Sequence, residues 1–95
     1  MSKSILLVED DATIARMYVQ KFEQAGFEVT HAIDAQAALT ALIDEKFDIL
    51  LIDILLPKIN GLQLIKEIRK DHRQDKTPIV IITNLLPAEL QLKDE

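Results

Sequence analysis

ILLVEDD at residues 5–11 and FDILLID at residues 47–53 are two stretches of the same kind, each with a run of four apolar residues, 5–8 and 49–52, that is followed by an acid. A strand with one face in water alternates apolar and polar residues, whereas an unbroken apolar run suits a strand covered on both faces. We therefore expect two buried strands, over residues 5–8 and 47–52, with the acids at their carboxyl ends.

The rest of the chain alternates between helical and extended patterns. Four segments have apolar residues at helical spacing, and Gly, Asp or Pro residues mark where these helices stop or start. Two further apolar segments fit strands. We expect helices over residues 12–24, 35–45 behind an Asp34 cap, 62–70 and from Pro87 onward, with strands over residues 28–32 and 78–83.

The helical spacing also predicts which side chains face the core. For the second helix these are Ala38, Leu39, Leu42 and Ile43; for the third they are Leu62, Leu64, Ile65 and Ile68; and in the first helix Met17 and Tyr18 are read as core residues.

Strands that alternate with helices imply a parallel sheet with right-handed crossovers and helices on both faces, which is the α/β class. In such sheets ligands gather outside the carboxyl ends of the strands, where the strand order reverses. The polar groups expected at that edge are Glu9, Asp10, Asp11, Asp53 and Thr83.

Length and composition restrict the kind of protein. The 95 residues are 48% hydrophobic with two Gly and three Pro, which predicts one globular domain over residues 1–95. There is no Cys, the first apolar run is too short for a secretory signal, and no apolar stretch reaches a membrane span, so we expect a cytoplasmic protein without membrane contact. The net charge of −5, without a basic cluster, argues against direct nucleic-acid binding.

In a sheet of order 2-1-3-4 the first and third strands are neighbours, so Asp10 and Asp53 would lie close together. Two carboxylates ~4 Å apart repel by about 4 kcal/mol at an effective dielectric near 20, so either a proton or a cation must intervene. An all-oxygen cluster suits Mg²⁺, and a carboxylate beside that ion is a plausible nucleophile for phosphorus, with Thr83 placed to donate its hydroxyl to a phosphoryl oxygen. The alternative is that these acids are solvated caps at strand ends.

Three features together resemble the receiver domains of bacterial response regulators. They are the run Ile5 to Asp11; Asp53 followed at plus four by Pro57 and at plus eight by Gly61; and the apolar run Ile79 to Ile82 that ends at Thr83. The resemblance covers the whole chain and implies a flavodoxin-like doubly wound parallel sheet.

The resemblance also implies a role for each matching residue. Asp53 would be the phosphoacceptor, Asp10 a direct Mg²⁺ ligand, Glu9 a ligand through water, and the Leu55 carbonyl a further ligand. Thr83 would be the switch hydroxyl, with Asn84 beside it. The phosphoryl donor would be a histidine kinase or a phosphotransfer protein, and no turnover enzyme is expected.

The sequence departs from the family at its end. It stops before the family's fifth strand and helix, and the active-site Lys has no counterpart, since Lys93 comes too early. We expect strand 78–83 to form an apolar edge that pairs with a second copy, as a homodimer or swapped assembly.

Three other readings are weaker or follow from these departures. A pseudo-receiver would act only as an interaction or dimerisation module. A turnover enzyme with an aspartyl nucleophile is disfavoured because position 55 is Leu, and a nucleotide site lacks a Gly-rich loop. His31 and His72 are read as ordinary surface histidines rather than phosphate carriers.

Overall fold

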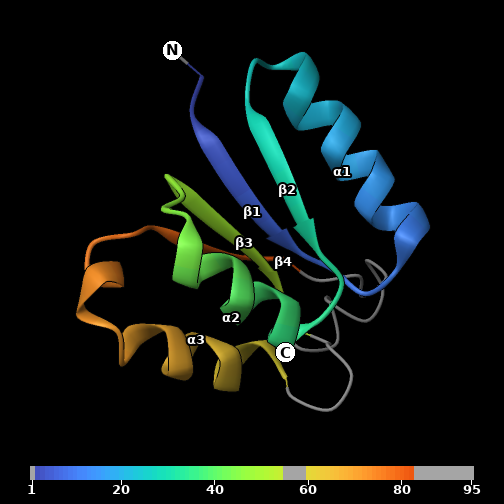
Figure 1. The fold of residues 1–95 in the computed structure, drawn as a ribbon. Helices are drawn as coiled ribbons and strands as arrows, with labels where there is room; N and C mark the ends of the chain where they lie inside the picture. Colours follow the sequence, from blue (N-terminus) through green and yellow to red (C-terminus); the bar gives the residue numbers. More distant parts are fainter. Residues whose placement is uncertain (1, 55–59, 83–95) are drawn as a thin grey trace, which may run out of the picture.

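The computed structural model describes residues 2–54 and 60–82 of the chain, which alternate between strands and helices (Figure 1). In chain order the elements are β1 (Ser4–Val8), α1 (Ala12–Gln24), β2 (Glu28–Ala32), α2 (Ala35–Asp44), β3 (Ile49–Asp53), α3 (Gly61–Arg69), the 3₁₀ helix η1 (His72–Gln74) and β4 (Ile79–Ile82). The expected helix from Pro87 lies outside the described residues.

The four described strands form one parallel sheet with the order β2-β1-β3-β4. This confirms the α/β class and the strand order expected from the sequence. The register between the two central strands pairs Leu6 with Leu50 and Val8 with Ile52. The carboxyl ends of β1 and β3 therefore meet at the same edge of the sheet.

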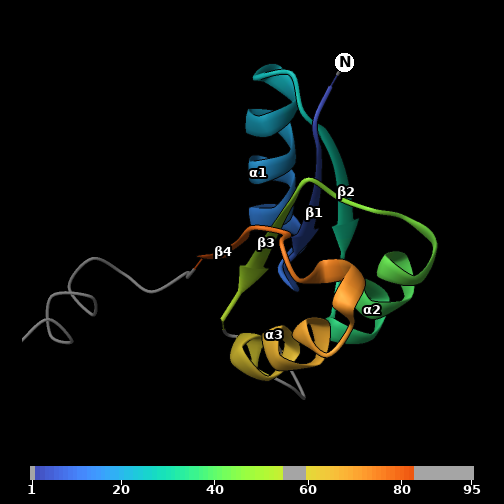
Figure 2. The same ribbon diagram turned by 90° about the vertical axis from the view of Figure 1, so that its left-hand side faces the viewer.

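Helices cover both faces of the sheet: α1 lies on one side and α2 and α3 on the other (Figure 2). Side chains alternate along each strand, so β1 contributes to two clusters. Ile5 and Leu7 pack with Ala15 of α1, whereas Leu6 and Val8 pack beneath α2 and α3. These four side chains of β1 are at most 1% exposed, which explains why residues 5–8 are a continuous apolar run.

Three residues expected in the core are instead exposed, so those predictions are wrong. Ile43 is 66% exposed, Met17 56% and Leu62 49%. Each of these helices packs one narrow stripe on the sheet, and the stripe of α2 runs through Ala38 and Leu42 rather than through Ile43. Helical spacing alone predicted a buried helix face that is one residue too wide, because several apolar residues flank each buried stripe.

The third strand begins later than the pattern predicted, at Ile49 instead of residue 47. Phe47 is buried, whereas Asp48 forms hydrogen bonds to the first residue of β1. Its carboxylate accepts a 2.7 Å hydrogen bond from the backbone N–H of Ser4, and its own N–H donates to the Ser4 carbonyl. These contacts join the amino ends of β1 and β3.

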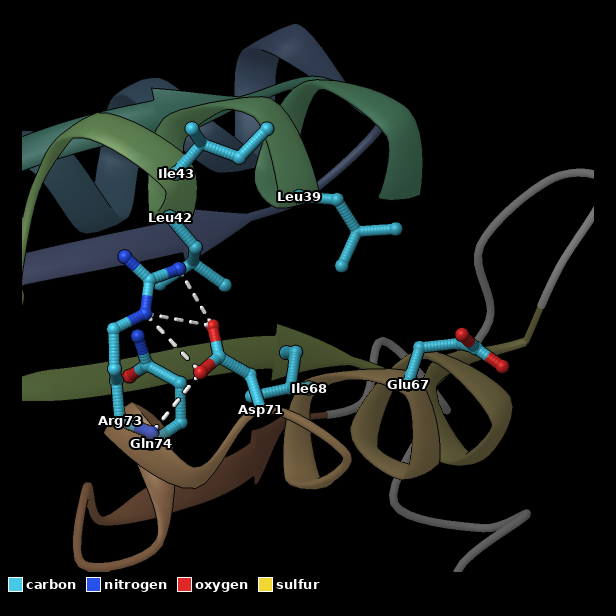
Figure 3. Close-up of a pocket in the computed structure, with 8 residues that line it drawn as sticks. All are labelled: Leu39, Leu42, Ile43, Glu67, Ile68, Asp71, Arg73 and Gln74. Carbon is cyan, nitrogen blue, oxygen red and sulfur yellow. Dashed lines mark hydrogen bonds and ion pairs between the residues drawn. The ribbon is translucent and has the colours of Figure 1, made fainter.

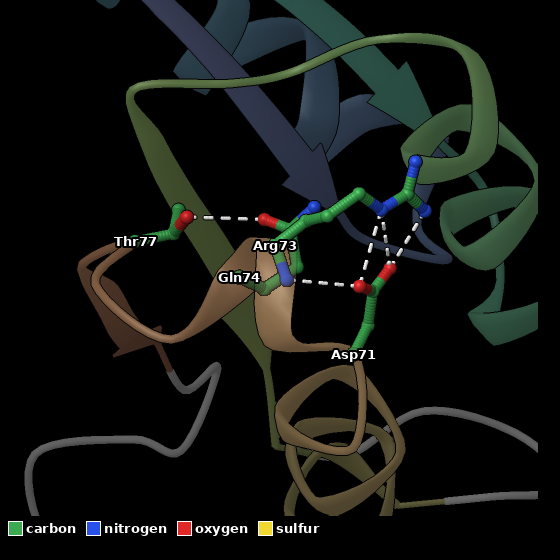
Figure 4. A network of polar contacts seen from close by, with 4 residues as sticks. All are labelled: Asp71, Arg73, Gln74 and Thr77. Atoms are coloured by element: carbon green, nitrogen blue, oxygen red, sulfur yellow. Dashed lines mark hydrogen bonds and ion pairs between the residues drawn. The ribbon is translucent and has the colours of Figure 1, made fainter.

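Residues 71–78, between α3 and β4, contain η1 and two buried polar side chains (Figure 4). Thr77 donates its hydroxyl to the side-chain oxygen of Gln74 at 3.0 Å, so both polar groups are satisfied in the interior. Asp71 caps η1 by accepting from the backbone N–H of Arg73, and its carboxylate also accepts from the Arg73 guanidinium. These hydrogen bonds lower the pKa of Asp71 from its ordinary value of 3.8.

None of the helices within residues 2–54 and 60–82 combines the length and apolar character needed to cross a bilayer.

Replacing Arg73 by Gln should raise the pKa of Asp71 toward its ordinary value. A lowered carboxyl pKa stabilises the fold above the ordinary pKa, and that contribution is lost as the pH falls through the lowered value. The free energy of unfolding of Arg73→Gln should therefore fall below that of the wild type at neutral pH, with the difference vanishing in acid. NMR titration of the Asp71 carboxyl carbon measures the shift. The control is Lys70→Gln, which removes an exposed cation paired with Glu67 and should leave the Asp71 titration unchanged.

Candidate functional site

Two buried carboxylates lie at the carboxyl edge of the sheet because of the strand register. Val8 pairs with Ile52, so the next residues, Glu9 and Asp53, come side by side as the two strands end. Alternation also directs both side chains to the α1 face, because Leu7 and Leu51, two residues earlier, belong to the cluster packed against α1. Glu9 and Asp53 are both 0% exposed.

Asp10 completes an acidic cluster of three side chains. One ligand atom from each of Glu9, Asp10 and Asp53 lies within 4.8 Å of the other two, and Asp10 is the exposed member. This confirms the expectation that residues 9, 10 and 53 converge. Asp10 provides an opening to solvent for a site whose other two carboxylates are buried.

The electrostatics of this acidic cluster favour a cation. Two unit charges 4.8 Å apart repel by about 3.5 kcal/mol at an effective dielectric near 20, and one ligand atom from each of the three carboxyl groups lies within that distance of the other two. Three oxygen-donating carboxylates with solvent access on one side are a donor set that fits a hard divalent ion, with water completing its coordination. The residues present therefore fit a metal ion.

Backbone contacts fix the first acid of the cluster. The N–H of Glu9 donates to the Ala32 carbonyl at 3.1 Å, and its side chain accepts a 3.1 Å hydrogen bond from the N–H of Asp11. Asp11 itself caps α1 by accepting from the N–H groups of Thr13 and Ile14. Of the three consecutive acids, Glu9 and Asp10 thus belong to the acidic cluster and Asp11 belongs to the helix cap.

Gly61 lets α3 begin directly against the backbone of Asp53. A Cβ atom at position 61 would lie 2.6 Å from the Asp53 carbonyl oxygen and 2.8 Å from the Ile54 Cα, closer than side-chain atoms are tolerated. The N–H of Gly61 donates to the Ile54 carbonyl at 3.0 Å, and Asn60 caps the helix through the N–H of Gln63. The first residues of α3 therefore support the end of β3.

Several residues that the resemblance assigns to the site lie outside the described residues. On β4, Ile82 pairs with Asp53, and the strand is described up to that residue. The residues concerned are Leu55, Pro57, Thr83 and Asn84.

A hollow of about 180 Å³ lies between α2, α3 and η1 (Figure 3). Leu39, Leu42 and Ile68 provide its apolar lining, and the Asp71–Arg73 ion pair lies at its rim. It shares no residue with the acidic cluster, and its lining offers no set of ligand atoms suited to a metal.

The sequence and fold agree with one known family. Residues 5–91 match the response regulator receiver domain. The chain is 39% identical over 79 residues to the transcriptional regulatory protein CpxR of Klebsiella pneumoniae, which covers 83% of the chain and 32% of that protein. It is 34% identical over 83 residues to the phosphate regulon transcriptional regulatory protein PhoB of Pseudomonas aeruginosa, covering 87% of the chain and 36% of that protein.

Solved structures show the same likeness. The chemotaxis response regulator CheY4 of Vibrio cholerae superimposes with a TM-score of 0.86 at 27% identity, covering 98% of this chain and 78% of the other. The Francisella response regulator 1452 receiver domain gives 0.79 at 30% identity, covering 97% and 74%. The family match over residues 5–91 agrees with the parallel 2-1-3-4 sheet and its acidic cluster, and the chain belongs to the response regulator receiver domain family. It spans about a third of the length of the relatives CpxR and PhoB.

Two contributions to the site were missed at the level of sequence. Gly61 was noted only for its spacing from Asp53, and nothing in the pattern announced its close backbone approach. His31 was read as an ordinary surface residue, yet its Nε2 lies 2.7 Å from the Glu9 carbonyl oxygen. A signal for His31 did exist, because β2 runs beside β1 and position 31 lies next to the end of that strand.

Replacing Gly61 by Ala should displace the end of β3. The added methyl group meets backbone rather than a flexible side chain, and overpacking of this kind costs about 1–3 kcal/mol of unfolding free energy. The amide resonances of Asp53 and Ile54 should shift in NMR spectra.

The matched control is Gly26→Ala. Gly26 has a φ of +97° and nothing within 4 Å of the added atom, so this variant is strained for a different reason and at the other end of the molecule. It should lose stability while leaving the Asp53 amide unmoved. Unshifted Asp53 and Ile54 amides in Gly61→Ala would contradict the proposed support.

Proposed function

We propose that this chain is the phospho-accepting module of a two-component signalling system, with Asp53 as the acceptor. The observation that carries the proposal is the convergence of Glu9, Asp10 and Asp53 within 4.8 Å in a member of the receiver family. Asp53 lies at the end of a buried strand, and its backbone is braced by Gly61. Such a fixed carboxylate is suited to nucleophilic attack because it needs little reorganisation.

In the proposed reaction a carboxylate oxygen of Asp53 attacks the phosphorus of a phosphohistidine on a histidine kinase or a phosphotransfer protein. The P–O bond forms as the P–N bond breaks, and the histidine nitrogen keeps the bonding electron pair and takes up a proton. The product is an acyl phosphate on Asp53. The chain is thus modified once per signal, as a regulatory domain rather than a turnover enzyme.

Mg²⁺ is the cofactor we propose, held by the carboxylates of Asp10 and Asp53, by Glu9 through water, and by the Leu55 carbonyl. The ion would neutralise charge on the transferred oxygens. Thr83 is proposed to donate its hydroxyl to one of those oxygens. The carboxylates of Glu9, Asp10 and Asp53 would surround the ion with negative charge.

The proposal extends to the setting of the domain. We propose that residues 1–95 belong to one receiver domain that works in the cytoplasm, with no membrane contact and no nucleic-acid contact of its own. The relatives CpxR and PhoB are named as transcriptional regulatory proteins, so a partner or a further domain would carry any contact with DNA.

Phosphoryl transfer to Asp53 can be measured with the small donor acetyl phosphate. Incubation with Mg²⁺ should add one phosphoryl group to the intact chain by mass spectrometry, and chelation of the ion should abolish the addition. Asp53→Asn should show no labelling, because the amide is not a nucleophile. The matched control, Asp44→Asn, changes an exposed acid at the end of α2 and should be labelled like the wild type. Full labelling of Asp53→Asn would rule out the assignment.

A second candidate function is an interaction module that pairs through β4, by homodimerisation or strand exchange. The observation that favours it is that Val80 and Ile81 are each 47% exposed on β4, which lies at one edge of the described sheet. An apolar edge strand presents unpaired backbone groups to another strand.

Light scattering on the purified chain tests this pairing. A dimer is expected, and Ile81→Lys should convert it to a monomer, because a charge on an edge strand opposes strand addition. Lys66→Glu, an exposed change on α3, is the control and should leave the mass unchanged. A wild-type monomer at all concentrations would exclude this second function.

A further inference from the structure

His31 stands beside the acidic cluster without belonging to it. It lies in β2, where it pairs with Leu7 of β1, one residue before the end of both strands. Its Nε2 lies 2.7 Å from the carbonyl oxygen of Glu9. Since a carbonyl oxygen can only accept, Nε2 must carry the hydrogen and act as the donor.

This contact completes a clamp on the backbone of Glu9. The N–H of Glu9 donates to the carbonyl of Ala32, which fixes the peptide that precedes Glu9. The hydrogen bond from His31 fixes the peptide that follows. Both flanking peptides are therefore anchored to consecutive residues of β2, which restrains φ and ψ of Glu9.

The hydrogen bond from His31 acts just beyond the last hydrogen bond of the sheet. Pairing between β1 and β2 ends at Val8 and Ala32, and Glu9 and Asp10 lie just beyond it. The peptide held by His31 joins Glu9 to Asp10, so its orientation determines where the Asp10 Cα lies. Asp10 is the exposed member of the cluster and lies outside any strand or helix, so this peptide is a main restraint on its position.

We propose that His31 is a positioning residue for the cation site: its Nε2–H holds the Glu9–Asp10 peptide so that both carboxylates face the ion. The inference rests on the proposed function and deepens it. In this role His31 would touch neither the ion nor the phosphoryl group, and its effect would be transmitted through the Glu9–Asp10 peptide. Removing the donor should weaken ion binding, whereas a side chain that restores an N–H at the same distance should recover it.

The experiment measures Mg²⁺ binding to the full chain by isothermal titration calorimetry for the wild type, His31→Phe and His31→Gln. His31→Phe keeps a ring without a donor and should raise the dissociation constant about fivefold, the net value of one hydrogen bond. The Gln amide nitrogen can occupy the place of Nε2, so His31→Gln should bind within about twofold of the wild type. His72→Phe is the control, because the His72 side chain is 94% exposed and lies on η1.

A second readout separates positioning from a general loss of structure. With Mg²⁺ at saturation, labelling of Asp53 by acetyl phosphate should proceed in His31→Phe at about the wild-type rate, since the defect lies in ion affinity. Wild-type affinity in His31→Phe, or equal weakening in the Phe and Gln variants, would overturn the role of His31 alone. A wild-type chain that binds no Mg²⁺ would overturn the proposed function and this inference together.

Discussion

The structure depends on the register between its two central parallel strands. Because Val8 pairs with Ile52, two apolar runs far apart in sequence end side by side, and the acids that follow them meet. The repulsion among three carboxylates opposes this arrangement, so the core must hold it. It does so with strands whose side chains are buried on both faces: a slip by one residue would turn Leu7 and Leu51 toward the wrong helices.

Local contacts at the carboxyl edge of the sheet further fix the positions of the acids that the register brings together. Gly61 allows a helix to start against the Asp53 backbone, and the carbonyl of Ala32 and the ring of His31 hold the peptides on either side of Glu9. Each of these contacts acts on the backbone. Together they fix where the strand-terminal acids lie.

Much of this was open to prediction from sequence because the signals are local and periodic. Helix α1 and strand β2 have the bounds that the pattern predicted. The approach of Asp10 to Asp53 followed from the expected strand order, and the family resemblance added Glu9 to the cluster. The exposure of Ile43 and Leu62 did not follow, since helical spacing cannot tell a buried stripe from its apolar margins. The fit of Gly61 and the reach of His31 depend on distances between distant segments, which a single sequence does not encode in a readable pattern.

Anomalous scattering would show whether the carboxylates of residues 9, 10 and 53 form one cation site. In crystals of this chain grown with Mn²⁺ as a substitute for Mg²⁺, we expect an anomalous peak bounded by these three side chains at the carboxyl edge of β1 and β3. A peak elsewhere, or none at that edge with the ion at saturating concentration, would contradict it.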